Sequence, residues 1–294
     1  MAKYSAMKNV LIIGHNGFIG KKLSQCLQDK RDYCVFTSDF RLQQTSELEN
    51  FILKNKVDTI VHLVSDLIPA SNEKDFTNSL HNVIIPTYKL IDIASENNIQ
   101  FVFLSSGGAV YGRHDDEIIT ESSQRRPINY YGFSKLMIED YILLKNKMSL
   151  LNYLILRPSN VYGEGQDPTK NQGFIAVALR KIYNNEEIVV WGDGKNSKNY
   201  IYVDDVVLVI EKILQKDLGN SVFNVCSDKN ISLNEIISVL AKIAGVDYKV
   251  AHVKSESFDV MNFWMSNDFL KSHFELNFTS FETGINKQIE FQFK

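Results

Sequence analysis

Two motifs in this chain carry residue types suited to chemistry. The first is Tyr131-Gly132-Phe133-Ser134-Lys135, in which Tyr131 and Lys135 are one helical turn apart and share a helix face. An ammonium beside a phenol favours the phenolate, so the pair predicts a lowered pKa for Tyr131. Such a phenol can take a proton from a hydroxyl or return one to a keto oxygen. The alternative interpretation is an amphipathic helix in which Tyr131 packs in the core and Lys135 is solvated.

The second motif is the glycine segment Gly14-His15-Asn16-Gly17-Phe18-Ile19-Gly20. It follows the apolar run Val10–Ile13 and precedes a predicted helix over Lys21–Lys30, which is the strand, turn and helix context of a dinucleotide-binding loop. The glycines permit a tight turn, close approach of the backbone to a pyrophosphate, and packing of the helix on the strand. The helix N-terminus then attracts the phosphate charge. Glycines also mark ordinary strand-to-helix turns, so this motif alone leaves both interpretations open.

Around these motifs, strand and helix patterns alternate, which predicts an α/β fold with a doubly wound parallel sheet. We expect a dinucleotide-binding domain over residues 1–163, with a returning strand near 221–226, and a smaller, discontinuous substrate-binding lobe over 164–294. The predicted strands are Val10–Ile13, Tyr33–Thr37, Thr59–Val64, Phe101–Ser105 and Tyr153–Leu156. The predicted helices are Lys21–Lys30, Ser46–Lys54, Asn82–Asn97 and Tyr131–Asn146.

The composition fits such a protein and gives no support to charge-driven partners. The chain has 294 residues, 44% hydrophobic content and a formal net charge of −3. Its length suffices for a full α/β core. Because the chain has no cluster of basic residues, neither nucleic acid nor a membrane surface is expected as a partner. The apolar runs are also far shorter than the roughly 18 residues of a membrane span. No secretory segment is recognised, so we expect a cytoplasmic protein that starts naturally at either Met1 or Met7.

The cysteines and histidines do not predict a metal site. The six histidines are scattered, and the three cysteines lack the spacing of metal ligands. We interpret the cysteines as reduced structural thiols: Cys26, Cys34 and Cys226.

Further motifs follow in a recognisable order: His62-Leu63, Asn82, the loop Ser105–Gly112, Arg157–Gly163 and Tyr200–Val207. Together with the first two motifs, they resemble the extended short-chain dehydrogenase/reductase family, in its NAD-dependent nucleotide-sugar epimerase/dehydratase branch, which includes UDP-glucose 4-epimerase-like enzymes. The resemblance implies a Rossmann fold with Tyr131 as the acid/base. It implies that Lys135 holds the nicotinamide ribose and tunes Tyr131. It also implies a homodimer through the helices Asn82–Asn97 and Tyr131–Asn146.

The resemblance and the glycine segment together imply NAD as the cofactor. Asp39 lies close to the expected spacing of about 20 residues past the glycines, where an acidic residue binds the ribose 2′-hydroxyl of NAD. If Asp39 instead reads the adenine edge, Ser38 and Arg41 suit the 2′-phosphate of NADP. Asn82 is interpreted either as the family's helix-start asparagine beneath the cofactor or as a polar N-cap. The expected cofactor-binding residues are Gly14, Asn16, Gly17, Phe18, Ile19, Gly20, Asp39, Leu63, Asn82, Tyr131 and Lys135.

The loop Ser105–Gly112 departs from the family pattern. The family places a catalytic serine or threonine five residues ahead of the glycine of its Val-Tyr-Gly turn, and here that position is Gly107. Ser106 is the expected substitute, as a catalytic and substrate-contacting residue; the alternative is that both serines merely end the strand. Gly108 and Ala109 stand where sugar dehydratases have an Asp-Glu pair, so dehydration by that mechanism is not expected.

The residues expected to bind the substrate also differ from the family pattern. Asn160 resembles a substrate-contacting amide of the family, although a loop asparagine can serve only its own backbone. The family binds the diphosphate with two arginines, whose positions correspond here to Lys198 and Glu256. A lysine offers a point charge in place of the planar guanidinium, and a carboxylate repels a diphosphate. Both changes weaken the expected binding of a nucleotide-sugar.

Three functions follow from these expectations. The first is an NAD-dependent epimerase that inverts C4 of a nucleotide-sugar through a 4-keto intermediate. The second is an NAD(P)H-dependent 4-ketoreductase of a nucleotide-deoxysugar. The third is a catalytically reduced dinucleotide-binding regulatory or scaffold protein.

Overall fold

A parallel sheet of six strands forms the centre of the computed structural model, which describes residues 7–114, 118–170, 173–216, 218–254 and 263–293. The strand order is β10-β6-β4-β3-β1-β2, and every neighbouring pair is parallel. This arrangement confirms the predicted α/β class. The strands are β1 (Lys8–Ile13), β2 (Tyr33–Thr37), β3 (Thr59–His62), β4 (Gln100–Leu104), β6 (Tyr153–Pro158) and β10 (Ser221–Val225).

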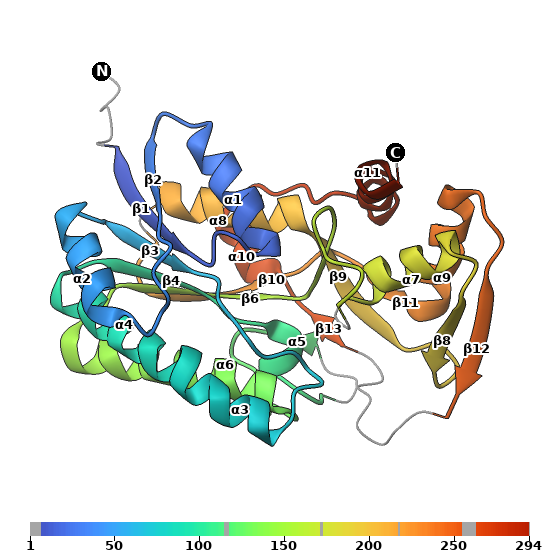
Figure 1. Ribbon diagram of the computed structural model, residues 1–294, viewed down its shortest axis with the longest axis horizontal. Coiled ribbons are helices and arrows are strands. Elements are labelled where there is room, and N and C mark those ends of the chain that lie inside the picture. Colours follow the sequence, from blue (N-terminus) through green and yellow to red (C-terminus); the bar gives the residue numbers. More distant parts are fainter. Residues whose placement is uncertain (1–6, 115–117, 171–172, 217, 255–262, 294) are drawn as a thin grey trace.

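Helices cover both faces of this sheet (Figure 1). Successive strand residues point to opposite faces. Ile12 therefore belongs to the apolar core shared with one helix group, whereas Leu11 belongs to the core shared with the other. The first group is α1 (Phe18–Gln28), α8 (Val203–Gln215) and α10 (Asp268–His273), and the second is α2 (Thr45–Lys54), α4 (Ile85–Glu96) and α6 (Tyr130–Ser149).

The helix predicted to begin at Asn82 in fact begins earlier. It starts as α3 (Glu73–Ser79) and continues through a π-helical turn (Leu80–Ile84) into α4. Asn72 caps α3: its side chain accepts from the Asp75 N–H at 3.1 Å, while the Asp75 carboxylate accepts from the Asn72 N–H at 3.0 Å. Asn82 therefore lies inside a helical run, and its interpretation as an N-cap is wrong. The wide turn precedes Pro86, which has no N–H for the α-helical ladder.

The rest of the chain forms a lobe beside the sheet, which contains β8, β12, α7 and α9 (Figure 1). Its core is shared by α7 (Phe174–Tyr183), α9 (Leu233–Ala244) and α11 (Phe281–Phe293). The segment beyond residue 163 also returns to the central sheet, because β10 pairs with β6 and α8 covers its face. The remaining strands are β5 (Ile118–Ile119), β7 (Asn160–Tyr162), β8 (Glu187–Trp191), β9 (Ser197–Tyr202), β11 (Asn230–Ser232), β12 (Lys249–Val253) and β13 (Trp264–Met265).

Candidate functional site

The glycine segment lies where the winding of the sheet reverses. From β1 the chain goes to β2 on one side and then to β3 on the other, and ligands bind at such a switch point, beyond the carboxyl ends of the strands. A Cβ at Gly20 would overlap the carbonyl oxygen of Gly14, so only glycine allows α1 to lie this close to the turn. The N-cap of α1 is Gly17, which has no side chain to cap the first N–H groups. This cradle fits the pyrophosphate of a dinucleotide.

Other residues predicted for the cofactor lie around this cradle. The Leu63 N–H donates to the Ile13 carbonyl at 2.9 Å, which brings the end of β3 beside the start of the glycine segment. Asp39 follows β2 and is exposed. Asn82 accepts a hydrogen bond from Gln43 Nε2 at 3.0 Å, so its amide is tied to the segment that follows Asp39.

Some residues of the glycine segment contact another part of the chain or solvent. Phe18 and Ile19 pack against the apolar core of the C-terminal lobe. Asn16 is exposed at the tip of the turn. The two hydrophobic residues thus join the turn to the lobe, in addition to any contact with a cofactor.

Tyr131 lies in the first turn of α6, held by two local features. The Asn129 side chain accepts from the Gly132 N–H at 2.8 Å and so caps the helix. A Cβ at Gly132 would overlap the Ala109 carbonyl oxygen, so glycine lets α6 approach α5 (Gly107–Val110). The approach places Tyr131 beside Ser106, whose side chain acts on the pKa of the phenol. The structure therefore brings together two of the three predicted catalytic residues.

The third, Lys135, lies one turn further along α6 and is buried. Its Nζ donates to the carbonyl oxygens of Leu104 at 3.0 Å and Val64 at 3.4 Å, at the ends of β4 and β3. Burial lowers the pKa of the ammonium to about 8, opposed by the carboxylates of Glu139 and Asp66. The alternative of a solvated lysine is therefore wrong.

The predicted lowering of the Tyr131 pKa is also wrong for these residues. Burial raises the pKa of the phenol above its ordinary value, and the hydrogen bond with Ser106 opposes that rise. The ammonium of Lys135 is engaged by two backbone carbonyls. Ser106, rather than Lys135, is the neighbour that favours the phenolate.

A buried ion-pair network behind Lys135 was not predicted from the sequence. Glu139 is fully buried and binds Arg157 through two hydrogen bonds, of 3.1 and 2.7 Å. Arg125 adds a third contact to this carboxylate at 3.2 Å. Arg157 also donates to the Tyr111 hydroxyl at 2.7 Å, and that hydroxyl donates to Asn224 on β10 at 2.7 Å. The network fixes α6 against the strands beneath the site.

His62, at the end of β3, is a further buried polar residue. Its Nε2 lies 3.0 Å from the Thr87 hydroxyl, while Nδ1 has no partner among the described residues. Burial, helped by the positive charge of Lys135, lowers the pKa of His62 to about 3. The imidazole is therefore neutral at physiological pH.

Of the predicted substrate residues besides Ser106, Asn160 lies on β7 and Lys198 on β9. The Asn160 amide donates to the Asn199 carbonyl at 2.8 Å, so this group ties two strands together. Asn199 is buried and accepts from the Ser159 hydroxyl at 2.7 Å and from the Ser227 N–H at 2.9 Å. Lys198 lies next to it and forms a backbone bridge with Phe263. Glu256 lies outside the described residues.

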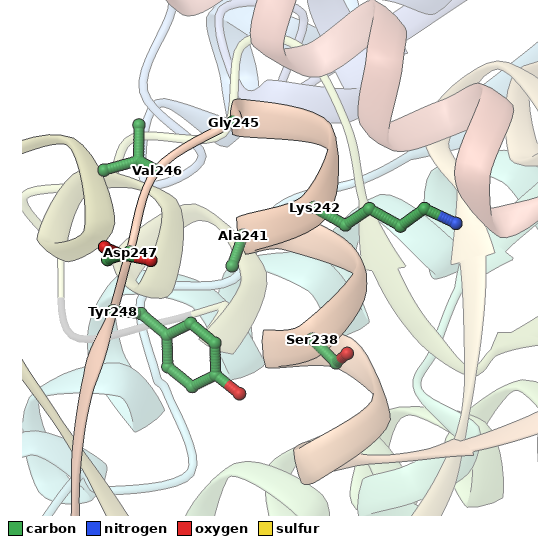
Figure 2. A pocket seen from close by; sticks show the side chains of 7 residues that line it. All are labelled: Ser238, Ala241, Lys242, Gly245, Val246, Asp247 and Tyr248. Atoms are coloured by element: carbon green, nitrogen blue, oxygen red, sulfur yellow. The ribbon is translucent and has the colours of Figure 1, made fainter.

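A cavity of about 350 Å³ lies elsewhere, in the C-terminal lobe (Figure 2). It is an open hollow between the end of α9 and the segment that leads to β12, and Tyr248 and Ser238 face one another across it (Figure 2). None of the predicted site residues lines it. The lining residues are Ser238, Ala241, Lys242, Gly245, Val246, Asp247 and Tyr248.

Two kinds of feature are absent from the described part of the chain. There, no group of three or more His, Cys, Asp or Glu side chains is arranged to hold a metal ion. Nor does any helix within the described ranges combine the length and the apolar character that a membrane span needs.

Comparison with known proteins identifies the family. Residues 10–226 match the model of the NAD dependent epimerase/dehydratase family. A putative UDP-glucose 4-epimerase of Methanocaldococcus jannaschii is 25% identical over 87% of this chain and 89% of its own. A dTDP-4-dehydro-6-deoxyglucose reductase of Escherichia coli is 30% identical over 80% of this chain and 82% of its own. The crystal structure of a UDP-glucose 4-epimerase of Thermotoga maritima, with UDP-glucose, superimposes with a TM-score of 0.89 at 25% identity, covering 96% of this chain and 98% of that one.

The family match agrees with the motifs and the fold described above. It confirms the predicted resemblance and the predicted cofactor, NAD. The chain belongs to the NAD dependent epimerase/dehydratase family.

Proposed function

We propose that this chain is an NAD-dependent epimerase that inverts C4 of the sugar of a nucleotide-sugar through a 4-keto intermediate. The observation that supports this best is the placement of Ser106 beside Tyr131, with Lys135 one helical turn further along α6. The family match supports the coarser activity, NAD-dependent modification of a sugar nucleotide. The similarity to the two 4-epimerases supports C4 as the reacting carbon.

In this proposal, residues of the chain carry out the proton transfer. The glycine segment Gly14–Gly20 would hold NAD, which would supply the hydride acceptor and donor for the sugar carbon. Tyr131 takes the proton of the C4 hydroxyl and gives it back after the sugar has turned its other face. Ser106 donates to the phenolate and so favours its formation, and Lys135 lies one helical turn further along α6.

The loop after β4 supports epimerisation over dehydration. Gly108 and Ala109 form part of α5 and carry no ionisable group. Elimination of water across a sugar ring requires an acid and a base besides Tyr131. Epimerisation and ketone reduction do not.

A 4-ketoreductase is the second candidate, and one observation favours it. The E. coli relative, at 30% identity, is named as a dTDP-4-dehydro-6-deoxyglucose reductase. A reductase would use the same Tyr131 to give a proton to the keto oxygen, and it would consume one reduced cofactor per turnover.

One experiment separates these candidates. The purified protein is denatured, its released nucleotide is quantified, and the intact protein is then incubated with UDP- and dTDP-hexoses without added cofactor. An epimerase carries bound NAD and interconverts C4 epimers, as followed by NMR. Oxidation of added NADPH or NADH in proportion to product with a 4-keto-6-deoxysugar nucleotide would establish the reductase instead. A protein that binds NAD but converts none of these sugars would reject both enzymes and leave the regulatory or scaffold role.

We also propose a homodimer built on α4 and α6. These helices expose the large apolar side chains of Ile85, Phe133 and Leu144, which a second copy would cover in such a dimer. Light scattering coupled to size exclusion tests this proposal. A Phe133→Glu variant is expected to elute as a monomer, whereas wild-type protein that is already monomeric would contradict it.

A further inference from the structure

Asn199 on β9 carries a buried amide that makes every hydrogen bond available to it. Only 1% of its surface is exposed. Its Nδ2 donates to the carbonyl oxygens of Ser227 at 2.8 Å and Lys229 at 3.1 Å. Its Oδ1 accepts from the Ser159 hydroxyl at 2.7 Å and from the Ser227 N–H at 2.9 Å. A carboxamide has two N–H donors and one oxygen with two lone pairs, so none of this capacity is left unused.

These partners require an amide at position 199. A backbone N–H can only donate and a carbonyl can only accept, so the partners also fix which end of the amide faces which group. A carboxylate of the same shape would keep the bonds from Ser159 and from the Ser227 N–H. Its other oxygen would face two carbonyl oxygens and could donate to neither.

The amide joins three segments of the chain at one edge of the central sheet. Ser159 follows the carboxyl end of β6, and Ser227 follows that of the neighbouring strand β10. The strand β9 lies between the two parts of the molecule, because Ile201 packs in the core of the sheet and Tyr200 in the core of the lobe. Asn199 therefore fixes β9 to the strand ends beyond which ligands bind in such sheets.

Two residues expected to bind the substrate lie directly beside this amide. Lys198 precedes Asn199 on β9. The Asn160 Nδ2 on β7 donates to the Asn199 carbonyl at 2.8 Å, which orients the side chain of Asn160. The Asn160 Oδ1 accepts no hydrogen bond from any described residue, so that end of the amide is available to a ligand.

We propose that Asn199 is a positioning residue: its amide fixes β9 to the ends of β6 and β10, and thereby holds Asn160 and Lys198 in place for the substrate. The placement of the substrate rests on the proposed function. The requirement for an amide at this position does not.

The requirement for an amide is tested by thermal unfolding, without substrate. Asn199→Asp keeps the shape but loses the bonds to Ser227 and Lys229, and is expected to lower Tm by roughly 5 to 10 °C at about pH 8. Burial beside carbonyl oxygens raises the pKa of the introduced carboxyl, which regains a donor when it is protonated, so the loss of Tm should shrink toward about pH 5. The neighbouring charges of Lys198, Asp228 and Lys229 are present in wild type as well, so the comparison at each pH isolates the introduced group.

Asn286→Asp is the matched control. Asn286 is exposed on α11, and its Nδ2 donates to a single carbonyl, that of Glu282, at 2.9 Å. Water replaces this bond, so the control is expected to stay within about 2 °C of wild type. A loss of Tm in Asn199→Asp no larger than in the control would overturn the proposal.

The positioning role is tested by measuring KM and kcat separately with a nucleotide-sugar. Asn199→Asp and Asn199→Ala are both expected to raise KM roughly tenfold, with kcat within about threefold of wild type, because the residues they displace bind the substrate without taking part in proton transfer. Ser159→Ala, which removes one bond to the same amide, is a milder uncharged variant and should raise KM by about threefold. A lowered kcat at unchanged KM, as a smaller folded fraction would produce, would overturn the role. A raised KM in Asn199→Asp alone would also overturn it, because it would show repulsion by the new charge.

If the native protein turns over no nucleotide-sugar, the proposed function fails, and a double variant then decides whether Asn199 holds Asn160. Both Asn160→Ala and Asn199→Asp loosen β7 from β9, so their losses of Tm are expected to be less than additive when combined. Additive losses would overturn the inference.

Discussion

Ser106, the N-cap residue of α5, lies beside Tyr131 in the first turn of α6, and its side chain makes no capping hydrogen bond. Burial raises the pKa of this phenol, and Ser106 opposes the rise. The phenolate required for proton abstraction is thus favoured by a neighbour on a different segment of the chain.

The first prediction concerns this pKa. Ser106→Ala removes the bond that lowers the pKa of Tyr131, so the phenol is expected to titrate at higher pH. The measurement is an NMR titration of ¹³C-labelled tyrosine, with Tyr131→Phe for assignment. Ser105→Ala is the matched control, because the adjacent Ser105 hydroxyl is buried without a partner among the described residues. Equal titration of Tyr131 in the two serine variants would show that Ser106 has no special role.

The second prediction concerns acid stability through His62. Its pKa is lowered from 6.5 to about 3 in the folded protein, so the unfolded chain binds more protons between these values. Its contribution to the free energy of unfolding is therefore complete above pH 6.5 and is lost as pH falls toward 3. At about pH 5 the expected loss is about 2 kcal/mol relative to about pH 8.

A His62→Gln variant, which lacks this titration, isolates the effect. Urea unfolding at about pH 8 and about pH 5 should show wild type losing about 2 kcal/mol more than the variant between the two conditions. All other titrating groups are common to both proteins and cancel. The same loss in both proteins would mean that His62 titrates normally.

The third prediction concerns the buried ion pair. Glu139→Gln leaves the guanidinium of Arg157, which is 3% exposed, without its carboxylate, and is expected to lower the free energy of unfolding by about 3 to 5 kcal/mol. Asp140→Asn is the control. That carboxylate binds Arg125 at 2.7 Å but is 55% exposed, so its loss should cost less than about 1 kcal/mol. Denaturant unfolding measures both losses. Similar losses of the free energy of unfolding in the two variants would contradict the proposed importance of the buried pair.

The central sheet could be predicted because its strands and helices are marked by patterns in short stretches of sequence. Parallel strands covered on both faces are short, continuous apolar runs, such as Val10–Ile13, and amphipathic helices separate them. The missed helix α3 has little of this pattern. Its only buried residue is Ser79, and it is held by the cap between Asn72 and Asp75. That cap, an asparagine followed three residues later by an aspartate, was the one available signal.

The residues of the site could be predicted from sequence motifs, but their contacts could not. Tyr131, Lys135 and Ser106 were identified from spacing and resemblance, and the structure places Tyr131 beside Ser106 and Lys135 one turn further along α6. The partners of Lys135 are backbone carbonyls, which no sequence pattern reports.

The most direct test of the central claim, that Tyr131 transfers the proton, is the turnover of Tyr131→Phe on a nucleotide-sugar, measured with Tyr130→Phe as the control. Tyr130 is the adjacent residue, 37% exposed and stacked on Phe76, so its hydroxyl should be dispensable. We predict that Tyr131→Phe lowers kcat by roughly 10²- to 10⁴-fold while bound NAD stays unchanged, and that Tyr130→Phe retains wild-type turnover. A Tyr131→Phe variant with wild-type turnover would contradict the account.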